Sequence, residues 1–200
     1  MVEGIILAAG SSQRAETFKP ELLLGEKTLL EHALSGMYNI CERIIVVGGY
    51  EVDRVRGILS SYAKVEVVEN MNWQTGMFSS VKVGVAQVKG ERFFFLPADV
   101  PLVPENVYRK LLLHQGDIII PVFGERKGHP VLFQRAVVAD ILSEPDDSNL
   151  RQVIRRRGFV IVPTEHQEVL MDVDTPEDYD WIQRRLHNAN SSEGKERSLS

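Results

Sequence analysis

The sequence predicts an α/β fold in which a parallel or mostly parallel sheet carries helices on both faces. Short apolar runs typical of buried strands alternate at least four times with stretches whose apolar residues recur at helical spacing. The chain has 200 residues, of which 44% are hydrophobic, so one domain with a substantial core is expected. None of the apolar runs approaches the ~20 residues that a membrane-spanning helix needs.

The expected strands are short runs rich in branched and aromatic residues, most of them next to Gly or Pro. They cover residues 4–7, 44–47, 65–68, 93–96, 117–122, 131–133 and 159–162. Because such runs carry almost no polar residues, most of these strands should be buried on both faces of the sheet.

Helices are expected over residues 28–38, 52–62, 104–113, 149–156 and 176–186, with one more beginning near Ser79. Thr28 and Glu31 have the spacing of a capping box, and Pro176 stands at a favoured first-turn position. A loop is expected between the strand at 65–68 and the helix near Ser79. We assign residues 1–187 to one domain and expect the polar residues 188–200 to form a disordered tail.

Composition excludes several classes of protein. The formal charge of −5 argues against general nucleic-acid binding, and the lone Cys41 permits no intramolecular disulfide. No CxxC pair is present, the histidines are scattered, and the N-terminus lacks the pattern of a signal peptide. We therefore expect a cytoplasmic protein without a membrane partner. The basic run 155–157 is interpreted as the solvated end of a helix, with contact to an anionic ligand as the alternative.

Ligands of such sheets bind outside the carboxyl ends of the strands, and the loop that follows the first strand has suitable chemistry. Residues 8–12 are small and allow close approach of backbone N–H groups to phosphate oxygens, while Arg14 and Lys19 add positive charge. A plain turn with solvated cations is the alternative. Residues 25–28 imitate the end of a P-loop without its other glycine, and we interpret them as a turn followed by a helix cap.

An aspartate, Asp99, leaves the apolar strand at 93–96 between Pro97 and Pro101. The two prolines restrict the backbone there, and a carboxylate at a strand end can hold Mg²⁺ together with water and substrate phosphates. The alternative function, capping of the helix at 104–113, would require an acid closer to the helix start.

Two further acids, Asp172 and Asp174, precede the last expected helix and fall on the same side of an extended segment. Asp174 or Thr175 could instead cap that helix, with Glu177 and Asp178 favouring its positive end. Capping does not require both acids before Thr175, so a ligand-binding role stays open beside it.

Together these motifs resemble the nucleotidyltransferases that attach CMP or GMP to the pterin of the molybdenum cofactor. The resemblance runs over about residues 2–186 and rests on residues 7–25, 70–80, 97–101, 128–130 and 172–178, which occur in the family's order. It implies a Rossmann-like, three-layer nucleotidyltransferase fold of the GT-A-like type, with a mostly parallel mixed sheet.

The resemblance also implies residue roles. Arg14, Lys19, Asp99 and Asp174 would be catalytic, and the two acids would bind Mg²⁺ or Mn²⁺. The nucleotide would contact Leu7, Ala8, Ala9, Gly10, Ser11, Ser12, Arg14, Lys19, Gly76, Ser79, Ser80 and Ala98. The acceptor would contact Pro101, Gly128, His129 and Asp172, although His129 could equally be a structural residue in a turn. The Ala8-Ala9 pair resembles the cytidylyl branch of the family, which favours CTP over GTP.

The implied function is transfer of CMP from CTP to a molybdopterin-type acceptor by a monomeric enzyme. The product would serve a molybdenum hydroxylase or its insertion factor. Ala15-Glu16 replaces the family's Met-Gly, and residues 146–151 lack two glycines found in many members. These departures leave two alternatives open: transfer to another phosphorylated acceptor such as a sugar phosphate, and a non-catalytic carrier or insertion partner of the cofactor.

Overall fold

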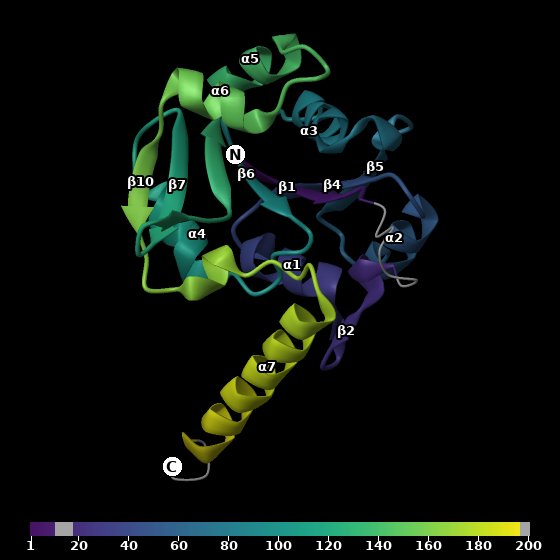
Figure 1. The fold of residues 1–200 in the computed structure, drawn as a ribbon, viewed down its shortest axis with the longest axis vertical. Helices are drawn as coiled ribbons and strands as arrows, with labels where there is room; N and C mark the ends of the chain where they lie inside the picture. The colour runs from purple at the N-terminus through teal and green to yellow at the C-terminus, as the bar shows by residue number, and fades with distance from the viewer. Residues whose placement is uncertain (11–17, 197–200) are drawn as a thin grey trace.

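A mixed sheet flanked by helices forms the centre of the computed structural model, which describes residues 1–10 and 18–196, with side chains as far as residue 186 (Figure 1). The strands lie in the order β10-β7-β9-β6-β1-β4-β5, with β8 paired to β7. Their bounds are β1 Val2–Ala8, β4 Arg43–Gly48, β5 Val65–Glu69, β6 Arg92–Pro97, β7 Ile118–Phe123, β8 Arg126–Lys127, β9 Val131–Gln134 and β10 Val160–Pro163.

Most neighbouring strands are parallel, as the strand–helix alternation predicts. β1 pairs in parallel with β4 and β6, β4 with β5, and β7 with β10, whereas β9 is antiparallel to β6 and β7. β1 therefore lies between two parallel neighbours, with Ile5 opposite both Ile45 and Phe95. This arrangement brings the carboxyl ends of β1, β4 and β6 to one edge of the sheet.

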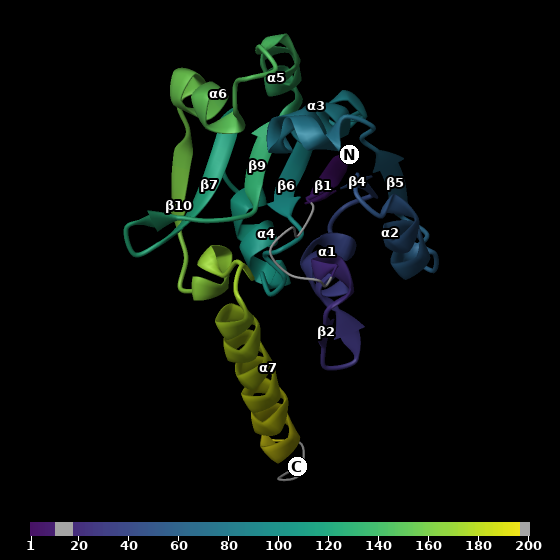
Figure 2. The same ribbon diagram turned by 45° about the vertical axis from the view of Figure 1, so that its right-hand side comes forward.

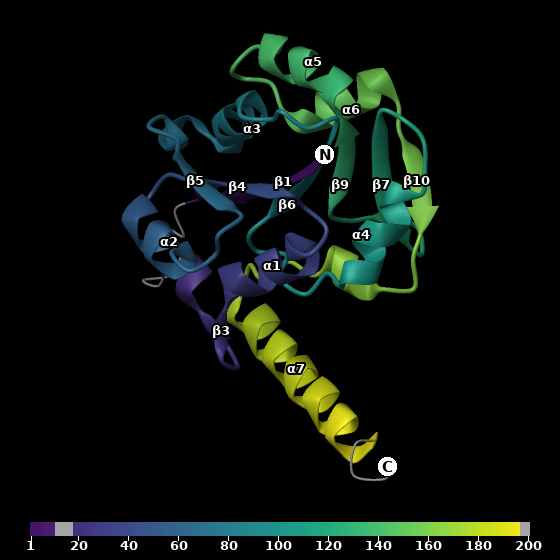
Figure 3. The same ribbon diagram turned by 180° about the vertical axis from the view of Figure 1, so that it is seen from behind.

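Two layers of helices cover the faces of the sheet (Figures 1 and 3). On one face pack α1 (Leu29–Tyr38), α2 (Val52–Leu59) and α4 (Glu105–Leu112), and on the other α3 (Met77–Ala86), α5 (Val138–Ser143) and α6 (Leu150–Arg157). Alternation along β1 serves both layers, because Ile6 belongs to the first core cluster and Ile5 to the second. Burial of apolar area on both faces is the main stabilising term.

A smaller third cluster joins the hairpin β2–β3 (Leu23–Leu24 and Lys27–Thr28) to α7 (Pro176–Glu196). Leu24 and Leu29 pack there against Val173 and Ile182, and the Tyr179 hydroxyl donates to the Leu23 carbonyl oxygen. Figures 1 and 2 show α7 extending away from the sheet beside this hairpin. The C-terminal helix is thus anchored by its first turns.

Local signals placed several boundaries correctly. The capping box at Thr28 and Glu31 is confirmed in both directions, and Gly25 has the positive φ of a turn before it, at 64°. The basic run ends α6 with exposed side chains, as expected, and Arg157 pairs there with Asp117 and Asp140. In the part of the chain that the structure describes, no helix is long and apolar enough to cross a membrane.

Other boundaries differ from expectation. Helix α3 begins at Met77 rather than near Ser79, and α2 ends at Leu59 rather than at residue 62. The helix expected to end at residue 186 continues to Glu196. The domain boundary at residue 187 and the disordered tail after it stay predictions. The sequence did not predict β2, β3, β8 or α5, each of which has six residues or fewer.

Candidate functional site

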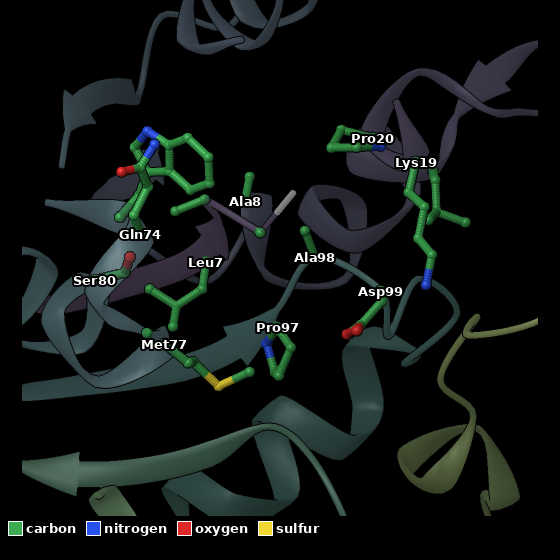
Figure 4. Close-up of a pocket in the computed structure, with 15 residues that line it drawn as sticks. Leu7, Ala8, Lys19, Pro20, Gln74, Met77, Ser80, Pro97, Ala98 and Asp99 are labelled. Atoms are coloured by element: carbon green, nitrogen blue, oxygen red, sulfur yellow. The ribbon is translucent and has the colours of Figure 1, made fainter. Parts of the chain in front are cut away.

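A cavity of about 610 Å³ opens at the carboxyl ends of β1 and β6 (Figure 4). Its wall comes from these two strand ends, the loop before α3 and the short 3-10 turn Lys19–Glu21. The lining residues are Leu7, Ala8, Ala9, Gly10, Lys19, Pro20, Leu29, Trp73, Gln74, Gly76, Met77, Ser80, Pro97, Ala98 and Asp99. A cavity of this size is in the range of small-molecule and cofactor sites.

The end of β1 forms the middle of the cavity. The Ala98 amide donates to the Leu7 carbonyl oxygen at 3.0 Å, which ties the end of β6 to the end of β1. The side chains of Ala8 and Ala9 are buried, and no atom of the described residues lies within 4 Å of a Cβ built on Gly10. The strand thus ends in small residues at the cavity wall. The predicted ligand residues Ser11, Ser12 and Arg14, and the unusual Glu16, lie outside the described residues.

Lys19 is held by a segment far away in the sequence. Its ammonium group donates to the Val173 carbonyl oxygen at 3.0 Å, and to the carbonyl and Oδ1 oxygens of Asp174 at 3.3 Å and 3.2 Å. The Val173 amide in turn donates to the Asp99 carbonyl oxygen at 2.9 Å. These bonds bring together the three sequence regions that carry Lys19, Asp99 and Asp174, as the predicted sheet requires.

Asp99 lies half-buried where the chain leaves β6. Burial raises the pKa of its carboxyl group to about 6; Asp174 raises it further, Lys19 acts in the opposite direction, and Asp172 also raises it. Asp99 does not cap the next helix, because α4 begins after Pro104 and has no side-chain cap bond. In the part of the chain that the structure describes, the Asp99 carboxylate thus caps no helix, and it lines the cavity.

Asp174 is also free from capping duty. The Thr175 hydroxyl accepts from the Asp178 amide at 3.2 Å, and Asp178 Oδ2 accepts from the Thr175 amide at 2.8 Å. This reciprocal pair caps α7, which settles the alternative that the sequence left open. Asp174 Oδ1 accepts from Lys19. Asp172 and Asp174 are both exposed, and neither lines the cavity itself.

The donor set at this end of the cavity fits a divalent cation. Mg²⁺ usually takes one or two carboxylates and completes its shell with water and phosphate oxygens. Asp99 and Asp174 could supply the carboxylates. Burial is the main cause of the raised pKa of Asp99 and Asp174 the second, so a bound cation would favour the charged form of this carboxyl group. Over residues 1–10 and 18–196, no group of three or more His, Cys, Asp or Glu side chains forms a complete protein cage.

The loop after β5 supplies the opposite end of the cavity. The Asn70 amide group donates at 2.8 Å to the hydroxyl oxygens of both Ser79 and Ser80, and its Oδ1 accepts from the Asn72 amide. Ser80 lines the cavity, but Ser79 donates to the Gly76 carbonyl oxygen and does not reach it. Gly76, with a φ of 115°, begins α3 and lines the wall, as predicted.

The four residues predicted to contact the acceptor do not line this cavity. Pro101 is buried, and Gly128 is required by packing, since a Cβ there would lie 2.3 Å from the Val169 carbonyl oxygen. The His129 ring packs near Phe95, and its Nδ1 is buried without a hydrogen-bond partner. Burial, with Arg151 contributing, lowers the pKa of His129 to about 4, so its imidazole is neutral at physiological pH.

Sequence reasoning missed several lining residues. They are Pro20, Leu29, Trp73, Gln74, Met77 and Pro97. A signal was available for two of them: Trp73 and Gln74 stand in the loop already assigned to the nucleotide, and an aromatic residue in a polar loop is a common ligand contact. The sequence gives no such signal for Leu29 and Pro20, because their positions depend on how α1 packs against the sheet.

A nucleotide-sized cavity at the carboxyl ends of a mostly parallel sheet, with an ammonium group and a carboxylate at one end, defines a nucleotide-binding α/β protein. The chain belongs to the family described as MobA-like NTP transferase domain, whose model matches residues 4–169. It is therefore a nucleotidyltransferase.

Relatives of known annotation agree with this family. The chain is 28% identical over 179 residues to a molybdenum cofactor cytidylyltransferase of Escherichia coli, covering 89% of this chain and 93% of that protein. It is 26% identical over 202 residues to a probable molybdenum cofactor guanylyltransferase of Bacillus mycoides, covering 92% of this chain and 97% of the relative.

Solved structures show the same fold. A nucleotidyl transferase from Methanothermobacter thermautotroptrophicus superposes with a TM-score of 0.83 at 21% identity, covering 94% of this chain and 99% of that chain. A Mycobacterium tuberculosis protein solved in complex with manganese gives a TM-score of 0.75 at 23% identity, covering 92% and 98%. The predicted Rossmann-like nucleotidyltransferase fold is confirmed.

Proposed function

We propose that this nucleotidyltransferase transfers CMP from CTP to the phosphate of a molybdopterin-type acceptor, with release of pyrophosphate. The observation that carries the proposal is the division of the cavity. Figure 4 shows Lys19 and Asp99 at one end and Gln74 and Ser80 at the other, with Ala8 and Ala98 between them. Such a cavity suits a ligand with charged phosphates at one end and a polar ring at the other.

In the proposed reaction a terminal phosphate oxygen of the acceptor attacks the α-phosphorus of CTP. The bond from the α-phosphorus to the bridging oxygen breaks, and the electron pair leaves with pyrophosphate. The acceptor phosphate is already ionised, so no general base is required. Lys19 would leave Asp174 in part to bind phosphate oxygens and balance the charge that develops on them, with Arg14 as a second cation.

Asp99 and Asp174 would hold Mg²⁺, or Mn²⁺, when the nucleotide binds. The bound cation would neutralise phosphate charge and orient the triphosphate. This assignment is supported by the bond of Lys19 to Asp174 Oδ1 and by the bond of the Val173 amide to the Asp99 carbonyl oxygen, which holds the two acidic segments together. Burial and then Asp174 raise the pKa of the Asp99 carboxyl group, and a cation would favour its charged form. A fold neighbour solved with manganese is in keeping with it.

The choice of CTP over GTP rests on the Ala8-Ala9 pair, whose side chains are buried at the cavity wall. Relatives named for either nucleotide match the chain, so the base is a proposal. The acceptor is inferred from the same two relatives, both named for the molybdenum cofactor. We propose Pro101, Gly128, His129 and Asp172 as the acceptor side, with a molybdenum hydroxylase or its insertion factor receiving the product.

The experiment is an assay of pyrophosphate release with Mg²⁺ and molybdopterin-type cofactor, in which CTP, GTP and ATP are compared. Release with CTP alone is expected. Release with GTP alone would keep the mechanism and contradict the base assignment. No release with any of the three would contradict the proposed reaction, and a second set of assays with sugar phosphates would then test the other acceptor class.

That second acceptor class is favoured by one observation. Residues 146–151 lack two glycines found in many family members. In this chain Asp146 pairs with Lys82 at 2.6 Å and Asn149 caps α6. This segment would therefore present other side chains to an acceptor than a glycine-containing segment does. A sugar phosphate would fit the same in-line chemistry, because its phosphate is equally ionised.

A further inference from the structure

One end of the cavity is built from an aromatic side chain that the reaction chemistry does not use. Trp73 lines the cavity, as do its neighbour Gln74, Gly76 and Ser80. Figure 4 shows Gln74 and Ser80 at one end of the cavity and Lys19 and Asp99 at the other. The indole is half-buried and packs against the core of the α3 face. Part of the Trp73 side chain is therefore held by the core, and the rest faces the cavity, where a ligand could contact it.

The position of Trp73 is fixed from several sides. The Asn70 amide donates to the Gly48 carbonyl oxygen at 2.8 Å, which anchors the start of the loop to the end of β4. The Trp73 ring contacts Tyr50 edge-on, with 5.6 Å between ring centroids. A short 3-10 turn, Trp73–Thr75, closes on the Gly76 amide. A held aromatic ring loses little conformational entropy when a ligand binds.

The close approach of Trp73 to the strand ends requires a glycine at position 49. A Cβ on Gly49 would lie 2.5 Å from the Trp73 Cβ atom and 3.0 Å from the Ala9 carbonyl oxygen. Any larger residue would displace the indole from the end of β1. The chain thus places an aromatic ring beside Ala9, the residue already expected at the base of the nucleotide.

We propose that Trp73 is the stacking platform for the nucleobase, and that the amide of Gln74 and the hydroxyl of Ser80 face the edge of the same ring. This inference rests on the proposed function and adds the residue that holds the base. Stacking on an aromatic side chain is tolerant of base identity, whereas groups at the ring edge discriminate between bases. Trp73 therefore supplies affinity, and discrimination is left to the edge groups and to Ala8-Ala9.

The chain contains two tryptophans, so the proposal can be tested by fluorescence. The other, Trp181, is exposed on α7, where Arg185 lies over its ring. In the Trp181→Phe variant all indole emission comes from Trp73. CTP is expected to quench this emission, whereas inorganic tripolyphosphate, which has no ring, should bind without quenching.

Affinities for the two probes are then measured by calorimetry on Trp73→Ala and Trp73→Phe. Trp73→Ala should weaken CTP binding by about tenfold or more and leave tripolyphosphate binding unchanged. Trp73→Phe should bind both probes about as tightly as the natural protein does. A purely structural role for Trp73 would weaken both probes together, which would overturn the proposal. Thermal unfolding of each variant separates loss of fold from loss of binding.

The outcomes distinguish the two levels of inference. If the natural protein binds CTP and Trp73→Ala binds it equally well, the stacking proposal is wrong and the proposed function stands. Quenching by a molybdopterin-type acceptor but not by CTP would also overturn it, because the ring would then serve the acceptor. If the natural protein binds no nucleotide, both the proposed function and the stacking role fail.

Discussion

A carboxylate lies at each end of β1, one of them fully buried and the other half-buried, and the pKa values of the two are shifted in opposite directions. Glu3, near the start of the strand, is fully buried; its Oε1 accepts from Arg43 at 2.9 Å, and its Oε2 accepts from the Gly90 and Lys89 amides at 2.6 Å and 2.7 Å. Burial alone would raise its pKa, but the bonds from Gly90, Arg43 and Lys89 outweigh burial and lower it.

At the other end of the strand, Asp99 has no such set of donors among residues 1–10 and 18–186. Burial and the neighbouring acids raise its pKa to about 6, and Lys19 offsets only part of this effect. The difference teaches how to separate structure from function in a buried acid. Glu3 has partners for both oxygens and stabilises the fold, whereas Asp99 keeps a charge that a bound cation or phosphate-bearing ligand can use.

The largest effect should follow removal of the satisfied acid. Glu3→Ala leaves the Gly90 and Lys89 amides without their partner and removes one acceptor of Arg43, which keeps Glu66 and the Gln87 carbonyl oxygen. The free energy of unfolding should fall by about 3–5 kcal/mol. Urea denaturation measures this change. Glu42→Ala is the control, since the Glu42 side chain is 63% exposed and contacts the N-terminal ammonium group and the Val2 amide. A loss as small as that of the control would mean that Glu3 does not anchor the strand.

Removal of the unsatisfied acid should change turnover instead. Asp99→Asn should lower kcat by about 10²–10³-fold, because charge stabilisation of the transferring phosphoryl group is lost. The free energy of unfolding should stay unchanged or rise, since burial and neighbouring acids disfavour the charge at this position. Pyrophosphate release measures the change in kcat, and urea denaturation measures the free energy of unfolding. Asp53→Asn, on the exposed face of α2, is the matched control. Full turnover in Asp99→Asn would contradict the contrast between the two acids.

Lys19 should matter next. Lys19→Ala should lower kcat/KM by roughly 10-fold to 10²-fold, the usual cost of losing a charged hydrogen bond. Lys19→Arg should recover part of the loss because it keeps the charge. Steady-state kinetics over a range of CTP concentrations separates the two variants. Equal activity of the natural protein and Lys19→Ala would limit Lys19 to its bonds with Val173 and Asp174.

The smallest effect concerns acid pH. Since the pKa of Glu3 is lower in the folded chain than in the unfolded chain, its stabilisation is complete above the unfolded pKa of about 4. It is lost as the pH falls through the folded pKa. In Glu3→Gln the free energy of unfolding should therefore decrease less steeply as the pH falls below the unfolded pKa. Thermal unfolding between about pH 5 and pH 3 measures this difference. Parallel curves for the two proteins would assign acid sensitivity to other carboxylates.

Much of the fold could be predicted because its signals are local. Apolar runs such as 93–96 are too short for helices and end at a proline, and the Thr28–Glu31 box lies within one helical turn. The hairpin β2–β3 and helix α5 could not be predicted, since pairs of residues or a six-residue helix gain their stability from neighbours rather than from propensity.

The site divides in the same way. Asp99 and Lys19 could be proposed from loops after strands, but the partner of Lys19 lies 154 residues away, and only the packed sheet brings them together. The acceptor residues were placed from motif order alone. Gly128 also packs closely against the Val169 carbonyl oxygen, a contact that no spacing in the sequence reveals.

The most direct test of this account is binding of Mn²⁺, followed by electron paramagnetic resonance, in the presence and absence of CTP. The natural protein should bind Mn²⁺ more tightly with CTP than without it, because the carboxylates and the triphosphate share one cation. Asp99→Asn should lose that gain, while Glu3→Gln, if folded, should keep it. Equal Mn²⁺ binding by the natural protein and Asp99→Asn would contradict the claim that Asp99 holds its charge for a metal-bound nucleotide.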